Sequence, residues 1–191
     1  GYLRSFGTGK TQIENEFIDD LAKNRGIAII DFSADAAPGI PLSLKQLVVS
    51  YISSILFQRF TDYKVKRDER YLLFIMEESQ NYCPNLSVYN VGYSLAREKL
   101  SLIATQGRKF GLSLCLVSQR PSFIDPIVLS MCNTFFIHRI SPDDIGFVKR
   151  ACGGLPPALE RRLTTLERGE VIVTGQMNMV PFPLLIKVPP R

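Results

Sequence analysis

The sequence lacks the signatures of several protein classes. No apolar run approaches the roughly 20 residues that cross a bilayer, and the opening GYLRSFGTGKT has no signal-peptide core. The four cysteines form no CxxC pair, and the single histidine, His138, cannot make a metal site alone. We therefore expect a cytoplasmic protein with reduced thiols and no membrane contact, in which His138 packs or hydrogen-bonds at a strand end.

Glycine and proline occur in ordinary numbers, 13 and 12 of 191 residues, far too few for a collagen-like or low-complexity chain. Hydrophobic residues make up 46% of the sequence, which excludes disorder and favours one globular domain. The formal net charge is +5. This mildly basic balance permits a nucleic-acid partner but does not require one.

Short apolar runs alternate with amphipathic helical patterns along the chain. Most of the early runs are apolar almost throughout, as strands buried on both faces are. The alternation predicts an α/β fold with a mainly parallel sheet and helices on both faces. Pro181 and Pro183 in the last run favour an antiparallel addition near the C-terminus. The six runs are residues 27–32, 71–77, 112–118, 133–140, 170–175 and 181–188.

The clearest helical pattern lies between the first two runs. Its apolar residues recur at helical spacing and predict one buried face, and Ser43 with Gln46 can form a capping box. The charged stretch 61–70 reads as a solvated connection. Further helices are expected over 94–109, from about Asp143 or Asp144, and over 157–166. The predicted buried face comprises Leu44, Leu47, Val48, Tyr51, Ile52, Ile55 and Leu56.

The first chemical motif is the glycine-rich segment GTGKT near the start. Its glycines let backbone N–H groups crowd around phosphates, Lys10 can reach the β- and γ-phosphates, and the Thr11 hydroxyl can bind Mg²⁺. The full phosphate-loop pattern has an earlier glycine where this chain has Arg4. A glycine-rich loop at a frayed terminus is the alternative interpretation.

The second motif is LLFIMEESQ, an apolar strand that ends in Glu77 and Glu78. In parallel sheets the carboxyl ends of the strands are where ligands bind. One acid can hold the Mg²⁺ shell and the other can polarise the attacking water. A charged strand end with no catalytic role has the same sequence.

The third motif, LVSQRP, places Gln119 at the end of another apolar strand. A glutamine there can sense the γ-phosphate or position water, although it can also be part of a polar turn before Pro121. Each motif alone is ambiguous. Because all three fall on predicted loop or strand edges, together they indicate one nucleotide site.

The stretch from Ile27 to Val188 resembles the C-terminal half of the RecA-like ATPase core of the HerA/FtsK superfamily. The resemblance rests on IAIIDFSA, LSLKQLVVSYISSILF, LLFIMEES, GRKFGLSLCLVSQRP, CNTFFIHRISPDD and LERGEVIVTG. It implies a P-loop NTPase core and an ATP-driven, homo-hexameric translocase of double-stranded DNA. It also implies work with a NurA-type nuclease in DNA end processing for recombination repair.

The likeness also implies roles for individual residues. Glu77 and Glu78 match the Walker B acids, with Glu77 and Thr11 on Mg²⁺ and Glu78 activating water. Gln119 matches the phosphate sensor. Arg108 would be offered to a neighbouring subunit's ATP, with Arg139 as a second candidate. From the residues alone, Arg108 fits equally a helix C-terminus that complements the macrodipole. The implied ATP-binding residues are Gly7, Thr8, Gly9, Lys10 and Thr11.

The chain departs from this family at its beginning. Only GYL precedes the Arg4 segment, so we expect the strand that presents the phosphate loop to be absent or truncated. Only Gln12 to Gly26 separates Thr11 from the first apolar run, where the family has a further strand and a helical insertion. We therefore expect one incomplete ATPase domain over 1–191. It would comprise a phosphate-loop segment at 1–12 and the C-terminal part of the core at 13–191, with residues missing near Gln12 and Ile13. Such an incomplete core is expected to turn over ATP poorly by itself.

Three other functions remain open from the sequence. A related conjugation or secretion ATPase is disfavoured by the lack of a membrane anchor. A catalytically silent ring component that binds DNA or a nuclease stays open because of the Arg4 departure. A small-molecule kinase would need an acceptor site, and the sequence offers no pattern for one.

Overall fold

The computed structural model describes residues 3–5, 15–23, 26–33, 38–92 and 94–189. The chain divides into two compact units. The first comprises Gly1–Glu77, Asn81–Cys83 and Tyr93–Leu116, and the second comprises Glu78–Gln80, Pro84–Gly92 and Val117–Arg191. Neither unit, in its described residues, holds a helix long and apolar enough to cross a bilayer.

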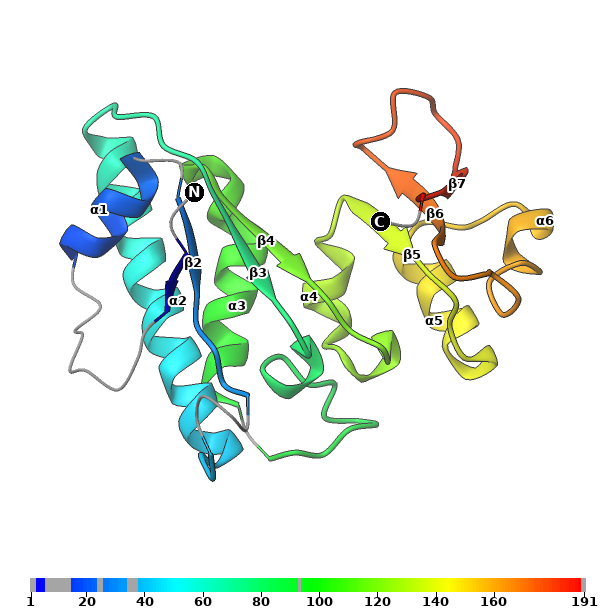
Figure 1. The fold of residues 1–191 in the computed structure, drawn as a ribbon, viewed down its shortest axis with the longest axis horizontal. Coiled ribbons are helices and arrows are strands. Elements are labelled where there is room, and N and C mark those ends of the chain that lie inside the picture. Colours follow the sequence, from blue (N-terminus) through cyan, green and yellow to red (C-terminus); the bar gives the residue numbers. More distant parts are fainter. Residues whose placement is uncertain (1–2, 6–14, 24–25, 34–37, 93, 190–191) are drawn as a thin grey trace. The chain divides into compact units, whose positions relative to one another are not determined.

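The first unit is built on parallel strands. β3 (Leu72–Met76) and β4 (Leu112–Leu116) pair in parallel with Leu72 opposite Leu112 and Met76 opposite Leu116. They therefore end at the same level, side by side in Figure 1. A second parallel pair joins β1 (Leu3–Ser5) to β2 (Ile27–Ile29). Among the described residues, a strand over Leu3–Ser5 thus precedes the predicted phosphate loop.

Helices cover one face of the β3–β4 pair. α2 (Leu42–Val65) packs against α3 (Leu95–Gln106), and α1 (Asn15–Lys23) packs against α2. Alternate residues of the strands point into this layer, as strand geometry requires. On the opposite face the side chains of Leu73 and Ile75 are 58% and 56% exposed. The expectation that helices cover both faces of the sheet therefore stays a prediction for this face. The buried core comprises Ile18, Ile52, Leu56, Phe60, Tyr63, Ile103 and Leu112.

The link between α3 and β4 requires glycine at one position. The 3₁₀ helix η2 (Gly107–Phe110) follows α3, and Gly111 then turns the chain with a φ of +82°. A Cβ atom on Gly111 would lie 2.0 Å from the carbonyl oxygen of Arg70, and the Leu72 N–H donates to the Gly111 carbonyl at 2.9 Å. This close approach fixes where β4 begins beside β3.

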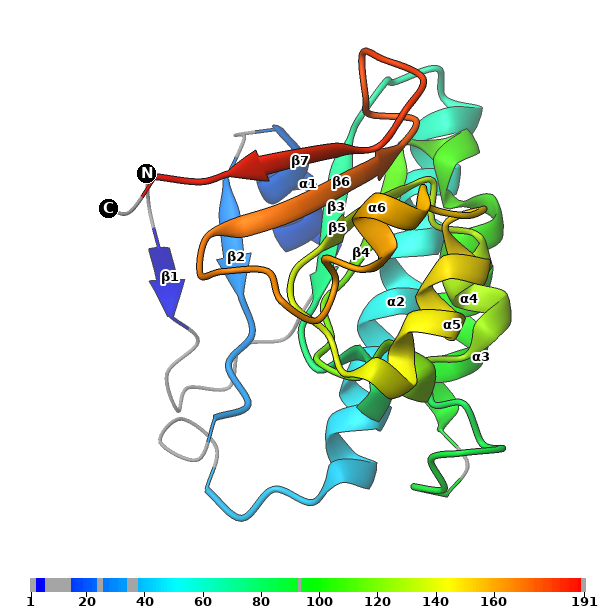
Figure 2. The same cartoon turned by 90° about the vertical axis from the view of Figure 1, so that its right-hand side faces the viewer.

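The second unit contains a three-stranded antiparallel sheet. β5 (Thr134–Ile137) pairs with β6 (Glu170–Gly175), which pairs with β7 (Leu184–Lys187), as Figure 2 shows. α4 (Pro126–Ser130), α5 (Pro142–Ala151) and α6 (Pro157–Glu160) complete the unit, with the short 3₁₀ helix η3 (Pro121–Phe123). The antiparallel addition predicted near the C-terminus is confirmed. Its core comprises Ile137, Val148, Leu155, Leu163, Leu166 and Ile172.

The buried face predicted for α2 is wrong in part. Ile52 and Leu56 are buried, but Leu44, Leu47 and Tyr51 are 44%, 50% and 58% exposed. The helix carries apolar residues on more than one face, and packing against α3 and β4 buries the overlapping stripe that includes Phe60. The capping box is also wrong. Pro41 is the N-cap residue and no side chain caps the helix. Gln46 is 5% exposed and donates to the Asn81 carbonyl at 2.7 Å.

The predicted connection over 61–70 is also corrected, because α2 continues to Val65. Tyr63 is buried, packs edge-on against Phe60 and donates its hydroxyl proton to Asp19. In contrast, α6 ends at Glu160, earlier than the predicted 166. His138 performs the predicted strand-end role, since its Nδ1 lies 3.0 Å from the Glu170 carbonyl oxygen, which can only accept.

An ion pair joins α1 to α2. The Arg59 guanidinium donates to both carboxylate oxygens of Asp19, with Nε at 2.6 Å from Oδ1. The Arg59 hydrogen bond, helped by Tyr63, holds the pKa of Asp19 below its usual range against the opposing effect of burial. A lowered folded-state pKa means that this stabilisation is present above the unfolded pKa and is lost as the pH falls through the folded value.

We predict that Asp19→Asn lowers the free energy of unfolding by about 1–2 kcal/mol at pH 7. The difference from wild type should shrink as the pH falls below about 4. Urea unfolding at several pH values measures both effects. Glu16→Gln, at an exposed position in the first turn of the same helix, is the matched control. A constant difference between Asp19→Asn and wild type from pH 7 to pH 3 would contradict this account.

Candidate functional site

The site begins where β3 and β4 end. Because Met76 lies opposite Leu116, the residues that follow each strand leave the pair at one edge. Glu77 and Glu78 follow β3, and both are exposed. Gln119 comes three residues after the end of β4 and is also exposed. This edge, at the carboxyl ends of parallel strands, is where α/β proteins bind ligands.

Two of the predicted catalytic residues meet. Gln119 donates a hydrogen bond from Nε2 to Glu78 Oε1 at 3.4 Å. The long distance indicates a weak bond that is easily exchanged. A carboxylate and a carboxamide at this spacing can share a water molecule, with the carboxylate accepting its proton and the carboxamide orienting it.

The turn after β3 holds Glu78 in an unusual backbone conformation. Its φ is +49°, in the left-handed region that costs a non-glycine residue roughly 1–2 kcal/mol. The next residue, Ser79, is fully buried and bridges to the other loop, since its N–H donates to the Val117 carbonyl at 3.0 Å. Its hydroxyl oxygen also accepts from the Val117 N–H at 3.1 Å. These bonds compensate part of the strain at Glu78.

Two polar residues that the motifs contain, but that we assign no role from sequence, complete this network. Gln80 is only 9% exposed and donates from Nε2 to Glu78 Oε2. Its Oε1 accepts from the Ser118 hydroxyl at 2.6 Å. One sequence signal could have identified Gln80 and Ser118. Both are polar residues close to the end of a predicted strand, and the register of the two strands brings these ends together.

An ion pair between the partly exposed Arg120 and the fully buried Asp144 holds the loop that carries Gln119. Arg120 Nε lies 3.1 Å from Asp144 Oδ2, and Asp144 is fully buried in the first turn of α5. Asp144 Oδ1 also accepts from the Ser122 N–H at 3.2 Å. The Arg120 guanidinium lies 4.6 Å from the centre of the Phe123 ring, and Phe123 stacks on Tyr89 at 4.8 Å. The loop therefore has one tightly specified shape.

The two candidate arginines lie elsewhere. Arg108 is exposed on η2, before β4 begins, whereas Glu77 follows the end of the paired strand β3. A five-residue strand spans roughly 16 Å, so Arg108 lies near the opposite end of the β3–β4 pair from Glu77. Arg139 is exposed just after β5. Among the described residues, neither arginine forms a hydrogen bond or an ion pair with Glu77 or Glu78.

The residues predicted to form the phosphate loop, Gly7, Thr8, Gly9, Lys10 and Thr11, lie outside the described residues. Within the described ranges no group of three or more His, Cys, Asp or Glu side chains could hold a metal by itself. The donors available at the strand edge are carboxylate oxygens, which suit a hard cation such as Mg²⁺. Burial raises the pKa of the Cys115 thiol on β4, so this cysteine stays protonated at neutral pH.

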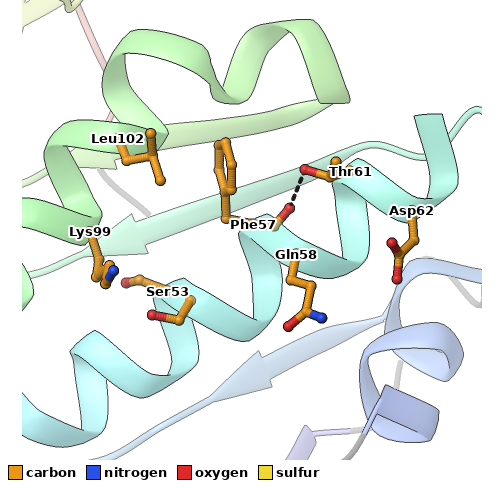
Figure 3. A pocket seen from close by; sticks show the side chains of 8 residues that line it. Ser53, Phe57, Gln58, Thr61, Asp62, Lys99 and Leu102 are labelled. Atoms are coloured by element: carbon orange, nitrogen blue, oxygen red, sulfur yellow. Dashed lines mark hydrogen bonds between the residues drawn. The ribbon is translucent and has the colours of Figure 1, made fainter. Parts of the chain in front are cut away.

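A separate hollow of about 320 Å³ lies between α2 and α3. In Figure 3 Lys99 and Leu102 on α3 face Ser53 and Phe57 on α2. Thr61 donates to the carbonyl of Phe57 in its own helix, the dashed line in Figure 3. None of the predicted site residues lines this hollow, and its hydroxyl groups at Ser54 and Thr61 bond within α2. We assign the chemistry to the strand edge.

Comparison with curated proteins identifies several relatives. The chain is 36% identical over 139 residues to the probable helicase MJ1565 of Methanocaldococcus jannaschii, covering 71% of this chain and 26% of that protein. It is 31% identical over 150 residues to the DNA double-strand break repair helicase HerA of Sulfolobus acidocaldarius, covering 76% and 29%. With HerA of Sulfurisphaera tokodaii it shares 29% identity over 198 residues, covering 94% and 38%. The chain thus spans about a quarter to two fifths of these relatives.

Solved structures show the same fold. The genome packaging NTPase B204 of Sulfolobus turreted icosahedral virus 2, in complex with ATP-gammaS, matches with a TM-score of 0.57 at 14% identity, covering 95% of this chain and 74% of that one. VirB4 of Thermoanaerobacter pseudethanolicus matches with a TM-score of 0.58 at 14% identity, covering 86% and 41%. No protein-family model matches the chain. The predicted α/β architecture is confirmed.

We predict that Arg120→Met destabilises the protein by about 2 kcal/mol, because it leaves the fully buried Asp144 carboxylate without its partly exposed cationic partner. Arg161→Met, at an exposed arginine of the same unit, should change the free energy of unfolding by less than about 0.5 kcal/mol. Urea unfolding of both variants measures the difference. Equal stabilities would show that the Arg120–Asp144 pair does not secure the loop.

Proposed function

Since the chain belongs to the HerA-like helicase family, we propose that it is the ATP-hydrolysing part of a motor that moves double-stranded DNA. The observation that carries this proposal is the hydrogen bond between Gln119 and Glu78 at the shared end of two parallel strands. A carboxylate beside a carboxamide at this edge fits the activation of water for phosphoryl transfer.

In this proposal each site residue has one role. ATP binds on Gly7, Thr8, Gly9, Lys10 and Thr11, with its Mg²⁺ held by Thr11 and Glu77. Bound Mg²⁺ neutralises charge that develops on the transferring phosphoryl group. Glu78 accepts a proton from the attacking water, and Gln119 detects the γ-phosphate by exchanging its weak bond to Glu78.

In this proposal the arginine that contacts the ATP comes from another copy of the chain. Because Arg108 lies near the far end of the β3–β4 pair from Glu77, it is better placed to reach a neighbour's ATP than its own. Arg139 is the second candidate for this role. An arginine supplied in trans stabilises the transition state only when the interface closes, so hydrolysis depends on assembly.

The finer parts of the proposal follow from the family. They are a homo-hexameric ring, partnership with a NurA-type nuclease, DNA end processing in recombination repair, and location in the cytoplasm. The formal charge of +5 is compatible with a nucleic-acid partner. The Arg4 departure keeps one alternative open, a catalytically silent ring component that binds DNA or a nuclease.

We predict that Glu78→Gln keeps the affinity for ATP within about threefold and lowers turnover at least about a hundredfold, because the substitution removes the general base. Calorimetric titration with ATP and Mg²⁺ measures binding, and steady-state phosphate release measures turnover. Glu69→Gln, at an exposed position before β3, is the matched control and should hydrolyse ATP at the wild-type rate. A Glu78→Gln protein as active as Glu69→Gln would remove Glu78 from the mechanism.

A further inference from the structure

Gln80 lies between the two loops of the site and uses both ends of its carboxamide. It belongs to the short 3₁₀ helix η1 (Ser79–Asn81) and is only 9% exposed. Its Nε2 donates to Glu78 Oε2, and its Oε1 accepts from Ser118 Oγ at 2.6 Å. One buried side chain thus links the carboxylate after β3 to the hydroxyl after β4.

In this series of hydrogen bonds each donor faces an acceptor, from Arg120 through Ser118 and Gln80 to Glu78. The Arg120 N–H donates to Ser118 Oγ at 3.1 Å, and the Ser118 hydroxyl donates to Gln80 Oε1. This leaves Gln80 Nε2, which only donates, facing Glu78 Oε2, which accepts from it. Because a carboxylate oxygen accepts hydrogen bonds, this orientation of the Gln80 amide satisfies Glu78 Oε2. The opposite orientation of the amide would set two acceptors against each other.

Both ends of this series of hydrogen bonds are held in place. Ser118 is fixed through the loop in which Arg120 pairs with the fully buried Asp144. Ser79, next to Gln80, is fully buried and hydrogen-bonded to the backbone of Val117. Gln80 therefore has little freedom to move, and the position of the Glu78 carboxylate follows from it.

Glu78 itself needs such support. Its positive φ is held only while surrounding bonds determine it, and its side chain is exposed. The second contact of its carboxylate, from Gln119, is long at 3.4 Å. The bond from Gln80 is the shorter of the two, so Gln80 orients Glu78 while leaving Oε1 to exchange Gln119 for water.

We propose that Gln80 is a positioning residue, which orients the carboxylate of Glu78 for attack by water through its bridge to Ser118. This inference rests on the proposed function of the site. Gln80 contacts neither nucleotide nor water in this role. It acts through Glu78, so its loss slows hydrolysis without weakening the binding of ATP.

The test compares Gln80→Met with Gln46→Met in steady-state ATP hydrolysis. Methionine keeps the length of glutamine but neither donates nor accepts as the amide does. Gln46 is the matched control because it is buried at 5% exposure and donates to the neighbouring Asn81 carbonyl, without contact to Glu78 or Ser118. We expect Gln80→Met to lower kcat between about tenfold and a hundredfold, with KM for ATP within about twofold of wild type.

Coupling between the bridging residues is the second readout. Ser118→Ala should lower kcat by less than Gln80→Met, and the double variant should be no slower than Gln80→Met alone, since the bridge is already broken. A kcat for Gln80→Met equal to that of Gln46→Met, or losses in the double variant that simply multiply, would overturn the inference. Thermal unfolding of each variant shows that the protein is folded at the assay temperature.

Failure of this inference can be told from failure of the proposed function. If wild type hydrolyses ATP, Glu78→Gln does not, and Gln80→Met is normal, then only the role of Gln80 is wrong. If wild type itself binds and hydrolyses no ATP, the proposed function fails, and the inference falls with it.

Discussion

The parallel pairing of β3 with β4 is the constraint on which the site depends. Its register sets Met76 opposite Leu116, so the segments after the two strands begin at one edge. Gly111 fixes the start of β4, because a Cβ atom there would meet the Arg70 carbonyl. A register change of one residue would turn every side chain of the strand to the other face, and would separate the polar residues that now meet after the strands.

The polar groups at the strand edge differ in burial. Asp144 and Ser79 are fully buried, Gln80 is nearly so, and Glu78 and Gln119 are exposed. Bonds between buried groups are specific and costly to break, whereas the exposed bond from Gln119 to Glu78 is long and weak. The buried bonds therefore hold the shape of the two loops. The exposed bond from Gln119 to Glu78 can be exchanged at the place where substrate would enter.

The strands were predictable from sequence because continuous apolar runs leave few alternatives, and all six runs contain strands at the expected places. The helix α2 shows the limit of periodicity. Ile52 and Leu56 belong to two overlapping stripes, and only packing against α3 and the sheet decides which stripe is buried. Likewise, Tyr63 lies in a stretch that is charged overall, but its contacts with Phe60 and Asp19 extend the helix.

The site was predictable only as a set of candidates. Glu78 and Gln119 stand out because each polar residue follows an apolar strand, and the structure brings them together. Gln80 and Asp144 do not stand out, since their roles arise from strand register and from a contact between residues 24 positions apart. The phosphate-loop residues and the arginine in trans stay predictions, because they depend on residues outside the described ranges or on a second copy.

The most direct test is ATP hydrolysis by the purified protein at increasing concentrations of linear double-stranded DNA, beside single-stranded DNA of equal length. A DNA-driven motor predicts turnover that rises severalfold with duplex and less with single strands, and that falls as salt weakens contacts to the phosphate backbone. Absence of hydrolysis with or without DNA, together with no Mg²⁺-dependent binding of ATP, would contradict the account and favour a silent structural component.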